Sequence, residues 1–317
     1  MVNLLSTSQS FYKPMRIPEP PSPPDFVTPP TAETTSEASS SVPIHGASPA
    51  ADPPPKKTTA SIGIAQVIQA FLLRLQELGL SKVSGTDGND RLNGWSGSLV
   101  DAGDGNDTVN VWSGSVVDAG AGNDSVKAWS ESRVHGGAGD DRIEVWSDSQ
   151  VDGGDGNDVI RAWSDSIVAG GAGNDDISGW SGSQIDGGEG DDVISVWSDS
   201  IASGGAGNDT IYAASGAVVS GGTGDDTISV GVDSTISFAA GDGKDTIYAD
   251  MNTRLELGGG ISRDKTHVTV SGNTATITFD GSDDQITMNL GPRGPASLAF
   301  ADGSSMEVRA EPRKLGA

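Results

Sequence analysis

A single 17-residue period runs through the middle of the chain and leaves it few ways to fold. From residue 85 to about residue 250, the same residue types return at every seventeenth position. The aspartates that keep this period are Asp90, Asp107, Asp124, Asp141, Asp158, Asp175, Asp192, Asp209 and Asp226. A fixed period of this kind indicates one structural unit per repeat, which buries its apolar face only by stacking on its neighbours. We therefore expect a solenoid.

Three further rows keep the same period. Two are aliphatic, from Leu92 to Ile228 and from Val100 to Ile236. The third contains every tryptophan of the chain: Trp95, Trp112, Trp129, Trp146, Trp163, Trp180 and Trp197. Residues 153–169 show the unit, which has two turns and two short strands with Ile160 and Val168 pointing inward. The sequence predicts an all-β fold, a parallel β-roll (solenoid) of about nine 17-residue coils stacked at ~4.8 Å.

The segments on either side of the repeats have other compositions. Residues 1–60 are rich in Pro, Ser and Thr, and we expect a disordered tail because they bury too little apolar surface. Residues 61–82 carry apolar side chains at helical spacing, which predicts an amphipathic helix that caps the first coil. The roll is expected over 83–250. Alternating apolar residues predict a C-terminal β cap over 251–309, followed by a tail over 310–317.

Each repeat carries a turn of the form Gly-Gly-x-Gly-x-Asp. Glycine adopts backbone conformations closed to other residues, so it lets carbonyl oxygens turn toward one point, and the aspartate adds a carboxylate. Hard oxygen ligands in a flexible cage suit Ca²⁺ better than Mg²⁺. Aspartates stacked ~5 Å apart would repel one another, so the stack requires cations. The turns therefore predict calcium sites.

These turns resemble the RTX (repeats-in-toxin) nonapeptide, as in residues 136–144 and 204–212, and residues 298–303 resemble the β domain that follows such repeats. The resemblance implies a secreted protein that is unfolded at low calcium and folds outside the cell. It implies about eight or nine calcium ions. The implied ligands are side chains at the nine periodic aspartates and at Asp245, with backbone carbonyls at Gly105, Gly122, Gly139, Gly156, Gly173, Gly190, Gly207 and Gly224.

The second half of each repeat departs from the RTX pattern. It has eight residues rather than nine, and Ser98, Ser115 and Ser132 stand where an aspartate would be expected. We expect no calcium of this type on that edge. Stacked tryptophans stabilise one another by about 0.5–1.5 kcal/mol per pair. The Trp95–Trp197 ladder is therefore either structural or a stripe that docks a polysaccharide or a cell surface.

Composition narrows the functions further. A formal charge of -25 argues against nucleic-acid binding. No apolar run is long enough to span a membrane, and residues 1–16 do not resemble a Sec signal peptide, so we expect non-Sec export. The three histidines lie far apart, and no catalytic motif is present, so we do not expect an enzyme. Positions 91, 108, 125 and 142 read Arg, Thr, Ser and Arg, which lacks the regular threonine row of an ice-binding roll.

The leading hypothesis is a secreted calcium-binding protein whose folding presents a surface for adhesion or extracellular matrix contact. A toxin-like effector delivered to a host cell is the alternative that the sequence leaves open. A carbohydrate-binding module that uses the tryptophan ladder is another.

Overall fold

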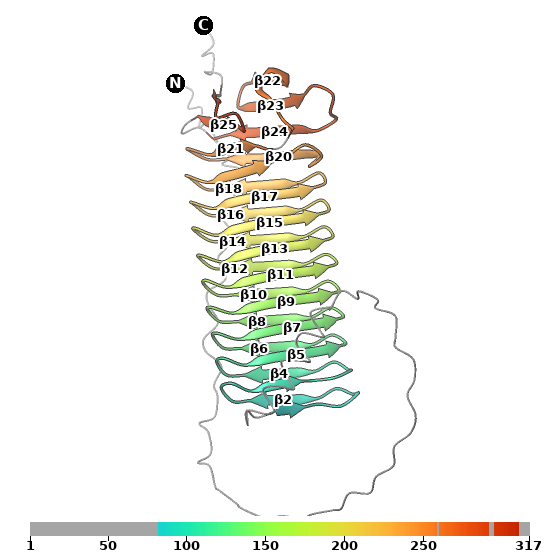
Figure 1. The fold of residues 1–317 in the computed structure, drawn as a ribbon. Coiled ribbons are helices and arrows are strands. Elements are labelled where there is room, and N and C mark those ends of the chain that lie inside the picture. The colour runs from blue at the N-terminus through green and yellow to red at the C-terminus, as the bar shows by residue number, and fades with distance from the viewer. Residues whose placement is uncertain (1–81, 259, 292–294, 311–317) are drawn as a thin grey trace, which may run out of the picture. The chain divides into compact units, whose positions relative to one another are not determined.

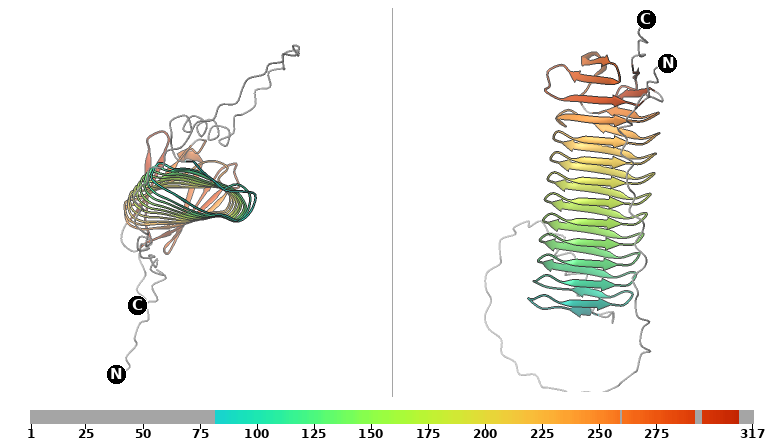
Figure 2. Two further views of the ribbon diagram at one scale, coloured as in Figure 1. Left: turned by 90° about the horizontal axis from the view of Figure 1, so that it is seen from below. Right: turned by 180° about the vertical axis from the view of Figure 1, so that it is seen from behind.

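The structure, a computed structural model, describes residues 82–258, 260–291 and 295–310. These residues wind into a solenoid of two 13-stranded sheets, and each coil gives one strand to each sheet (Figure 1). Viewed along the solenoid axis, the coils superimpose as a flattened ring (Figure 2). The predicted parallel β-roll is confirmed, with ten coils from β2–β3 to β20–β21 rather than nine.

The two sheets alternate along the chain. Sheet A, in spatial order, contains β1 (Lys82–Ser84), β3 (Leu99–Asp101), β5 (Val116–Ala121), β7 (Arg133–Ala138), β9 (Gln150–Asp155), β11 (Ile167–Ala172), β13 (Gln184–Glu189), β15 (Ile201–Ala206), β17 (Val218–Thr223), β19 (Thr235–Phe238), β21 (Arg254–Leu257), β25 (Ala296–Phe300) and β26 (Ser305–Val308). Sheet B contains β2 (Arg91–Gly94), β4 (Thr108–Val111), β6 (Ser125–Ala128), β8 (Arg142–Val145), β10 (Val159–Ala162), β12 (Asp176–Gly179), β14 (Val193–Val196), β16 (Thr210–Ala213), β18 (Thr227–Val230), β20 (Lys244–Ala249), β24 (Gln285–Leu290), β23 (Thr274–Phe279) and β22 (Thr266–Ser271). A 3-10 helix, η1 (Arg263–Lys265), precedes β22.

The 17-residue period sets the register of both sheets. Ile160 on β10 pairs with Ile143 on β8 and with Ile177 on β12, each 17 residues away. Val168 on β11 pairs in the same way with its equivalents on β9 and β13. Because side chains alternate between the two faces of a strand, this register keeps every inward residue in one column.

The core is a narrow layer between the two sheets. Ile160 and Ala162 from β10 are fully buried, and Val168 from β11 is 2 % exposed. Burying a side chain such as isoleucine stabilises a fold by about 1.5–3 kcal/mol. Each coil has few such residues, so its stability depends on stacking against the coils beside it.

The C-terminal strands continue the roll and then close it. The period lengthens to 19 residues where β20 follows β18 and β21 follows β19, as in the pairing of Ile228 with Ile247. Parallel stacking continues through β24 on β20 and β25 on β21, past residue 250. Antiparallel strands then end both sheets, with β23 and β22 beyond β24 and β26 beyond β25. The strands predicted for the C-terminal β cap therefore form.

Several predicted segments lie outside the described residues. These are the tail over 1–60, the capping helix over 61–82 except for Lys82, and all of the 310–317 tail except Ala310. Lys82 itself begins β1, so at this residue the prediction of a helix is wrong. The described residues contain no helix long and apolar enough to cross a membrane.

The packing predicts how two isoleucines of one coil differ. Ile160→Ala should lower the free energy of unfolding by about 2–5 kcal/mol because it leaves a cavity in a core one side chain wide. Ile167 lies on the outer face and is 49 % exposed, so Ile167→Ala should change it by about 0.5 kcal/mol or less. Denaturant unfolding in saturating calcium measures both. Equal losses would contradict the inward and outward assignment.

Candidate metal centre

The periodic aspartates form one ladder along the edge where strands of sheet A lead into strands of sheet B. Each carboxylate bonds to the coil before it, because Oδ1 accepts a hydrogen bond from the backbone N–H of the preceding aspartate in the row. For Asp158 and Asp175 this N–H to Oδ1 distance is 2.8 Å. The same bond links every neighbouring pair from Asp90 to Asp226 at 2.7–2.8 Å, and it links Asp226 to Asp245 at 3.2 Å.

The second oxygen of each ladder carboxylate is the unusual one. Oδ2 is buried and lacks a hydrogen-bond partner in Asp107, Asp124, Asp141, Asp158, Asp175, Asp192, Asp209 and Asp226. Buried carboxylate oxygens are costly unless they are paired or coordinate a metal. In the first turn, by contrast, Oδ2 of Asp90 accepts hydrogen bonds from the N–H and hydroxyl of Thr86. The ladder thus has a row of orphaned anionic oxygens that a cation would satisfy.

The turn glycines bring backbone oxygens close to these carboxylates. A Cβ placed on Gly153 would overlap both Oδ2 of Asp158 and the carbonyl oxygen of Gly170 in the next coil. Gly156 has φ 137°, and a Cβ there would overlap the carbonyl oxygen of Gly139. The carbonyls of Gly139 and its equivalents from Gly105 to Gly224 accept no backbone hydrogen bond in the described part of the chain, whereas the carbonyl of Gly243 in the last turn accepts one from the N–H of Gln285. Oxygens of successive coils therefore converge where only glycine fits.

Burial makes the ladder carboxylates difficult to ionise. Burial is the largest cause that raises the pKa of Asp124, Asp192 and Asp226 to about 6. It raises the pKa to about 7 for Asp141 and Asp175 and to about 8 for Asp245. The backbone hydrogen bond to Oδ1 partly offsets this effect, whereas neighbouring aspartates add to it. A bound cation would reverse the balance because it favours the ionised form.

These features fit calcium. Ca²⁺ takes six to eight oxygen ligands from carboxylates, carbonyls and water in a flexible arrangement. Within the described residues no three carboxylate or imidazole groups converge on one point, so carboxylates alone do not make the cage. Backbone carbonyls of the glycine turns would supply the further oxygens of a calcium cage, and the unpartnered Oδ2 atoms would supply the charge.

A second ladder on the same edge was missed in the sequence. The residue before each of the nine periodic aspartates from Asp90 to Asp226 is Asn or Asp, and its Oδ1 accepts a hydrogen bond from the backbone N–H of the equivalent residue in the next coil. Asn174 N–H donates to Asn157 at 2.8 Å, and Asp191 N–H donates to Asn174 at 2.9 Å. The constant choice of Asn or Asp at this position was the available signal. The two ladders together give each turn one backbone N–H that donates to the preceding coil, as in Asn174, and one that donates to the following coil, as in Asp175.

Serine hydroxyls connect the coils along the opposite edge. The buried Ser200 hydroxyl donates to the carbonyl oxygen of Trp180, 20 residues earlier, at 3.2 Å. Ser166 and Ser183 make the equivalent bond at 3.4 Å. The residue before each serine adopts a left-handed conformation even where it is not glycine, as in Asp165 with φ 60°. Serine hydroxyls therefore join the coils where the RTX pattern would place aspartate.

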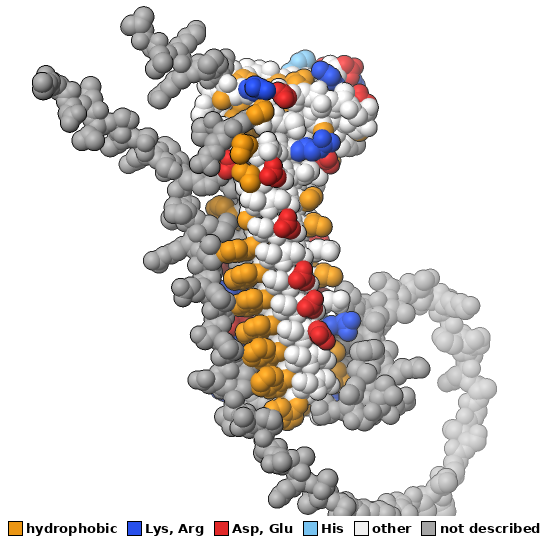
Figure 3. All heavy atoms as spheres, turned by 90° about the vertical axis from the view of Figure 1, so that its left-hand side faces the viewer, with side chains coloured by type: hydrophobic (Ala, Val, Ile, Leu, Met, Phe, Trp, Pro, Cys, Tyr) orange, Lys and Arg blue, Asp and Glu red, His pale blue; other side chains and the backbone are white. Residues whose placement is uncertain are grey.

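The tryptophans of this edge stack face to face. Five successive pairs from Trp112 to Trp197 have ring centroids 4.7–5.6 Å apart and planes within 17° of parallel. Figure 3 shows a hydrophobic column on this side of the roll, with acidic side chains in line beside it. Because the ring faces cover one another, the column offers ring edges to solvent. This geometry favours the structural interpretation of the row, since a sugar ring stacks on an exposed aromatic face.

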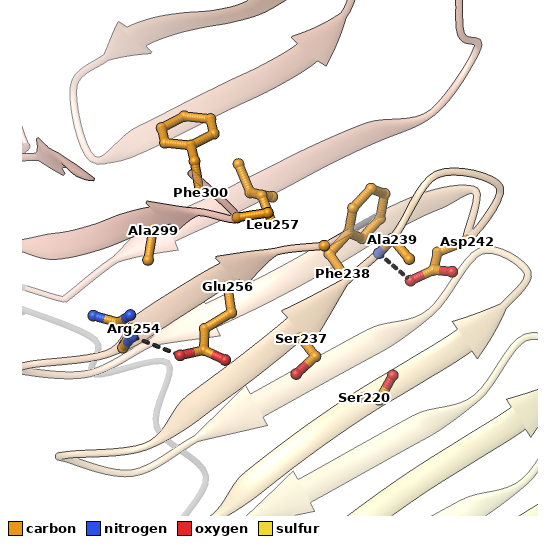
Figure 4. Close-up of a pocket in the computed structure, with 12 residues that line it drawn as sticks. Ser220, Ser237, Phe238, Ala239, Asp242, Arg254, Glu256, Leu257, Ala299 and Phe300 are labelled. Carbon is orange, nitrogen blue, oxygen red and sulfur yellow. Dashed lines mark hydrogen bonds and ion pairs between the residues drawn. The ribbon is translucent and has the colours of Figure 1, made fainter. Parts of the chain in front are cut away.

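A hollow among the described residues lies near the C-terminal end of the roll, beside the last turn of the aspartate edge. Its volume is about 400 Å³, and Phe238, Asp242, Arg254, Glu256 and Phe300 are among the residues that line it (Figure 4). Arg254 and Glu256 pair with each other at 2.7 Å, and Asp242 accepts a hydrogen bond from the N–H of Ala239. No histidine is among the described residues that line this hollow.

Comparison with known proteins agrees with the geometry of the turns. The family model for the RTX calcium-binding nonapeptide repeat (4 copies) matches residues 82–98, 132–149, 147–166, 164–183, 184–200, 198–217 and 218–234. Residues 82–98 and 132–234 therefore carry RTX repeats, a family of calcium-binding repeats. The match ends at residue 234, so the family relation of the C-terminal strands stays a prediction.

Two further comparisons say less. Among solved structures the chain is similar to the extracellular lipase LipA from Serratia marcescens, with 19 % identity and a TM-score of 0.27. The match covers 57 % of this chain and 37 % of the lipase chain. No curated protein matches the chain.

The raised pKa values predict how the metal-free roll responds to pH. Unfolded aspartates have a pKa of about 3.9, whereas the ladder carboxylates of the folded roll titrate at about 6 to 8. The folded roll therefore binds protons more tightly than the unfolded chain does. The stability that these protonated carboxylates contribute is fully present below about pH 4, and it is lost as pH rises through the folded-state pKa values of about 6 to 8. Denaturant unfolding in a chelator should show the midpoint falling as pH rises from 5, until near neutral pH the metal-free chain no longer folds, and saturating calcium should remove the fall. A midpoint that rises over this range would contradict the prediction.

Proposed function

We propose that this chain is a secreted calcium-binding protein whose folding is coupled to Ca²⁺. The observation that carries the proposal is the row of eight buried, unpartnered aspartate Oδ2 atoms along one edge. Each needs a cation or a proton, and at neutral pH in a calcium-rich medium Ca²⁺ is the available partner. The RTX repeats supply the same ligand chemistry.

The proposed ligands are those that the sequence indicates. The side chains are the nine periodic aspartates and Asp245, and the carbonyls are those of the fourth-position glycines, from Gly105 to Gly224. Ten turns leave gaps for about eight or nine ions. The last gap is distorted, because the 19-residue step lengthens the bond between Asp226 N–H and Asp245 Oδ1 to 3.2 Å.

Coupling between metal and folding follows from the ladder. Binding of Ca²⁺ to the folded chain alone stabilises that chain by mass action. In the low-calcium cytosol the carboxylates would face one another across successive coils without neutralisation, which favours the unfolded chain. Outside the cell the ions would bind and the coils would stack. This order suits export of an unfolded chain by a non-Sec route.

We further propose that the folded roll acts by contact rather than catalysis. Ten coils at ~4.8 Å give a rigid rod roughly 45 Å long, with extended flat faces suited to adhesion or to extracellular matrix contact. The two histidines of the described residues pair with aspartates at the surface, His135 with Asp152 and His267 with Asp280. Neither contacts a nucleophile, which supports a non-catalytic role.

Circular dichroism tests the coupling directly. The full chain in a chelator should lack β structure at neutral pH, and millimolar calcium should produce it. Tryptophan emission should change in the same titration, because the indole rings stack only when the coils do. Magnesium at the same concentration should have a smaller effect, given its demand for octahedral geometry. Identical β spectra with chelator and with calcium would refute the proposal.

Two neighbouring aspartates provide a matched pair of variants. Asp175 is buried in the ladder with an orphaned Oδ2, whereas Asp176 is exposed on the outer face of β12. Asp175→Asn keeps an acceptor for the Asp158 N–H but removes the anionic oxygen. A tenfold loss of affinity at one site lowers the free energy of unfolding by about 1.4 kcal/mol at saturating calcium.

We therefore expect Asp175→Asn to need more calcium to fold, and calorimetry should count at least one ion fewer. Asp176→Asn removes the same charge one residue away and should fold at the calcium concentration of the unmodified chain. Equal shifts for the two variants would mean that general acidity, rather than the ladder, controls folding.

A further inference from the structure

The outer face of sheet B changes its chemistry along the roll. Over its last seven strands (β14, β16, β18, β20, β24, β23 and β22), two parallel ranks of outward residues run across the strands. The first rank is Val193, Thr210, Thr227, Thr246, Thr287, Thr276 and Thr269. The second rank is Ser195, Tyr212, Ser229, Tyr248, Asn289, Thr274 and Ser271. We call these two ranks the hydroxyl face.

The hydroxyl face exists only in the folded chain. Its members up to Thr227 keep the 17-residue period, but Thr246 follows the 19-residue step, and Thr287 lies 41 positions beyond its partner Thr246. Thr276 and Thr269 then join by antiparallel pairing. Positions 91, 108, 125 and 142, which lack a threonine row, are the opposite end of this same rank.

Charge separates the two ends of sheet B. The N-terminal half of the two ranks carries Arg91, Lys127, Arg142, Glu144, Arg161 and Asp176. Glu144 there is held by Lys127 at 2.9 Å and by Arg142 at 2.8 Å. The hydroxyl face itself has no charged member, although the chain as a whole has a formal charge of -25; exposed Lys244, two residues before Thr246 on β20, lies at its border. A polar but uncharged surface of this size fits a partner that is itself polar and uncharged.

Two tyrosines of the second rank are the largest exposed side chains of the hydroxyl face. Tyr212 is 40 % exposed and Tyr248 is 46 % exposed. They lie two strands apart, roughly 9.6 Å, which is close to the length of two sugar units in an extended β-linked chain. The stacked aromatic pairs of the described residues are the five Trp–Trp pairs and Phe238–Phe279, so no aromatic ring covers either tyrosine.

We propose that the hydroxyl face binds a neutral, extended polysaccharide that lies across the strands. Threonine and serine hydroxyls both donate and accept hydrogen bonds, as the hydroxyls of a sugar chain do. The tyrosine rings, unlike the stacked tryptophans, are free to pack against sugar rings. The face spans about 29 Å at the strand spacing, long enough for several sugar units. This proposal rests on the proposed function, because the face forms only when calcium folds the roll.

Other occupants fit the face less well. An anionic polymer would be repelled by the acidic roll. A protein interface would place apolar and aromatic residues at its centre, whereas most members here carry hydroxyls. Ice would require a flat threonine array, and the two tyrosines project from the plane of the second rank. Ice and a second copy of the chain are therefore outcomes of the test below.

The test uses the calcium-loaded full chain and two insoluble neutral polymers, microcrystalline cellulose and chitin powder, in a depletion assay at physiological salt. The first variant is Tyr212→Ser with Tyr248→Ser. Its matched control is Ile201→Ser with Val218→Ser, which removes side chains 49 % and 43 % exposed from the outer face of sheet A. A third variant, Thr227→Val with Thr246→Val, keeps the shape of the first rank and removes its hydroxyls.

We expect the unmodified chain to bind at least one polymer. The affinity of the tyrosine variant for that polymer should be lower by a factor of about ten or more. The threonine variant should be weakened as well, and the control unchanged. Circular dichroism in calcium confirms that each variant folds. If the tyrosine variant does not fold, the threonine variant decides.

Several results would overturn the proposal. These are no binding to either polymer, equal binding by the tyrosine variant and the control, or binding only to an anionic polysaccharide. Inhibition of ice growth without polymer binding would replace the proposed partner with ice. A dimer that the tyrosine substitutions dissociate would replace it with a second copy. Failure of the calcium-dependent fold itself is seen separately, in the spectrum without polymer.

Discussion

The whole roll depends on carboxylates that are stacked and buried at one edge. Each Asp Oδ1 accepts a backbone N–H from the coil before it, which fixes the spacing and register of the turns. The same bond holds Oδ2 in a buried place without a partner. The cost of that arrangement raises the pKa of Asp175 to about 7. The fold therefore contains an electrostatic cost that a bound cation would remove, and this is the physical basis for the proposal that metal binding and folding share one equilibrium.

The second edge solves the same stacking problem with neutral groups. Buried serine hydroxyls bond to carbonyls of the preceding coil, and face-to-face indoles fill the space outside them. These contacts do not depend on calcium directly, but they form only between stacked coils. The two edges thus differ in kind. Under the proposed function, one makes folding conditional on an ion, and the other adds packing and hydrogen bonding once the coils are in place.

The C-terminal strands end the roll and also create a surface. An open stack of parallel strands would expose unpaired backbone groups at its end, and antiparallel strands β22, β23 and β26 extend both sheets beyond the last parallel strands. In sheet B these strands carry threonine and serine outward at the positions set by the coils below. The closing strands therefore lengthen a neutral face on a strongly acidic chain.

The sequence by itself determined the repeat, the two-strand coil, the inward rows and the calcium turn. These are local: a 17-residue period with Gly, Asp and aliphatic residues at fixed places has one economical way to stack. It did not reveal the Asn/Asp ladder at Asn157 and Asn174, because Asn or Asp before a turn aspartate also fits an isolated turn. It left open whether the tryptophan row is structural or a stripe that docks a polysaccharide, and the stacked rings of the structure favour the structural role. Only the tertiary structure decided which aspartate oxygens are buried without a hydrogen-bond partner and which threonines of the hydroxyl face lie side by side. Both depend on pairing across coils, and after residue 236 that pairing no longer follows the period.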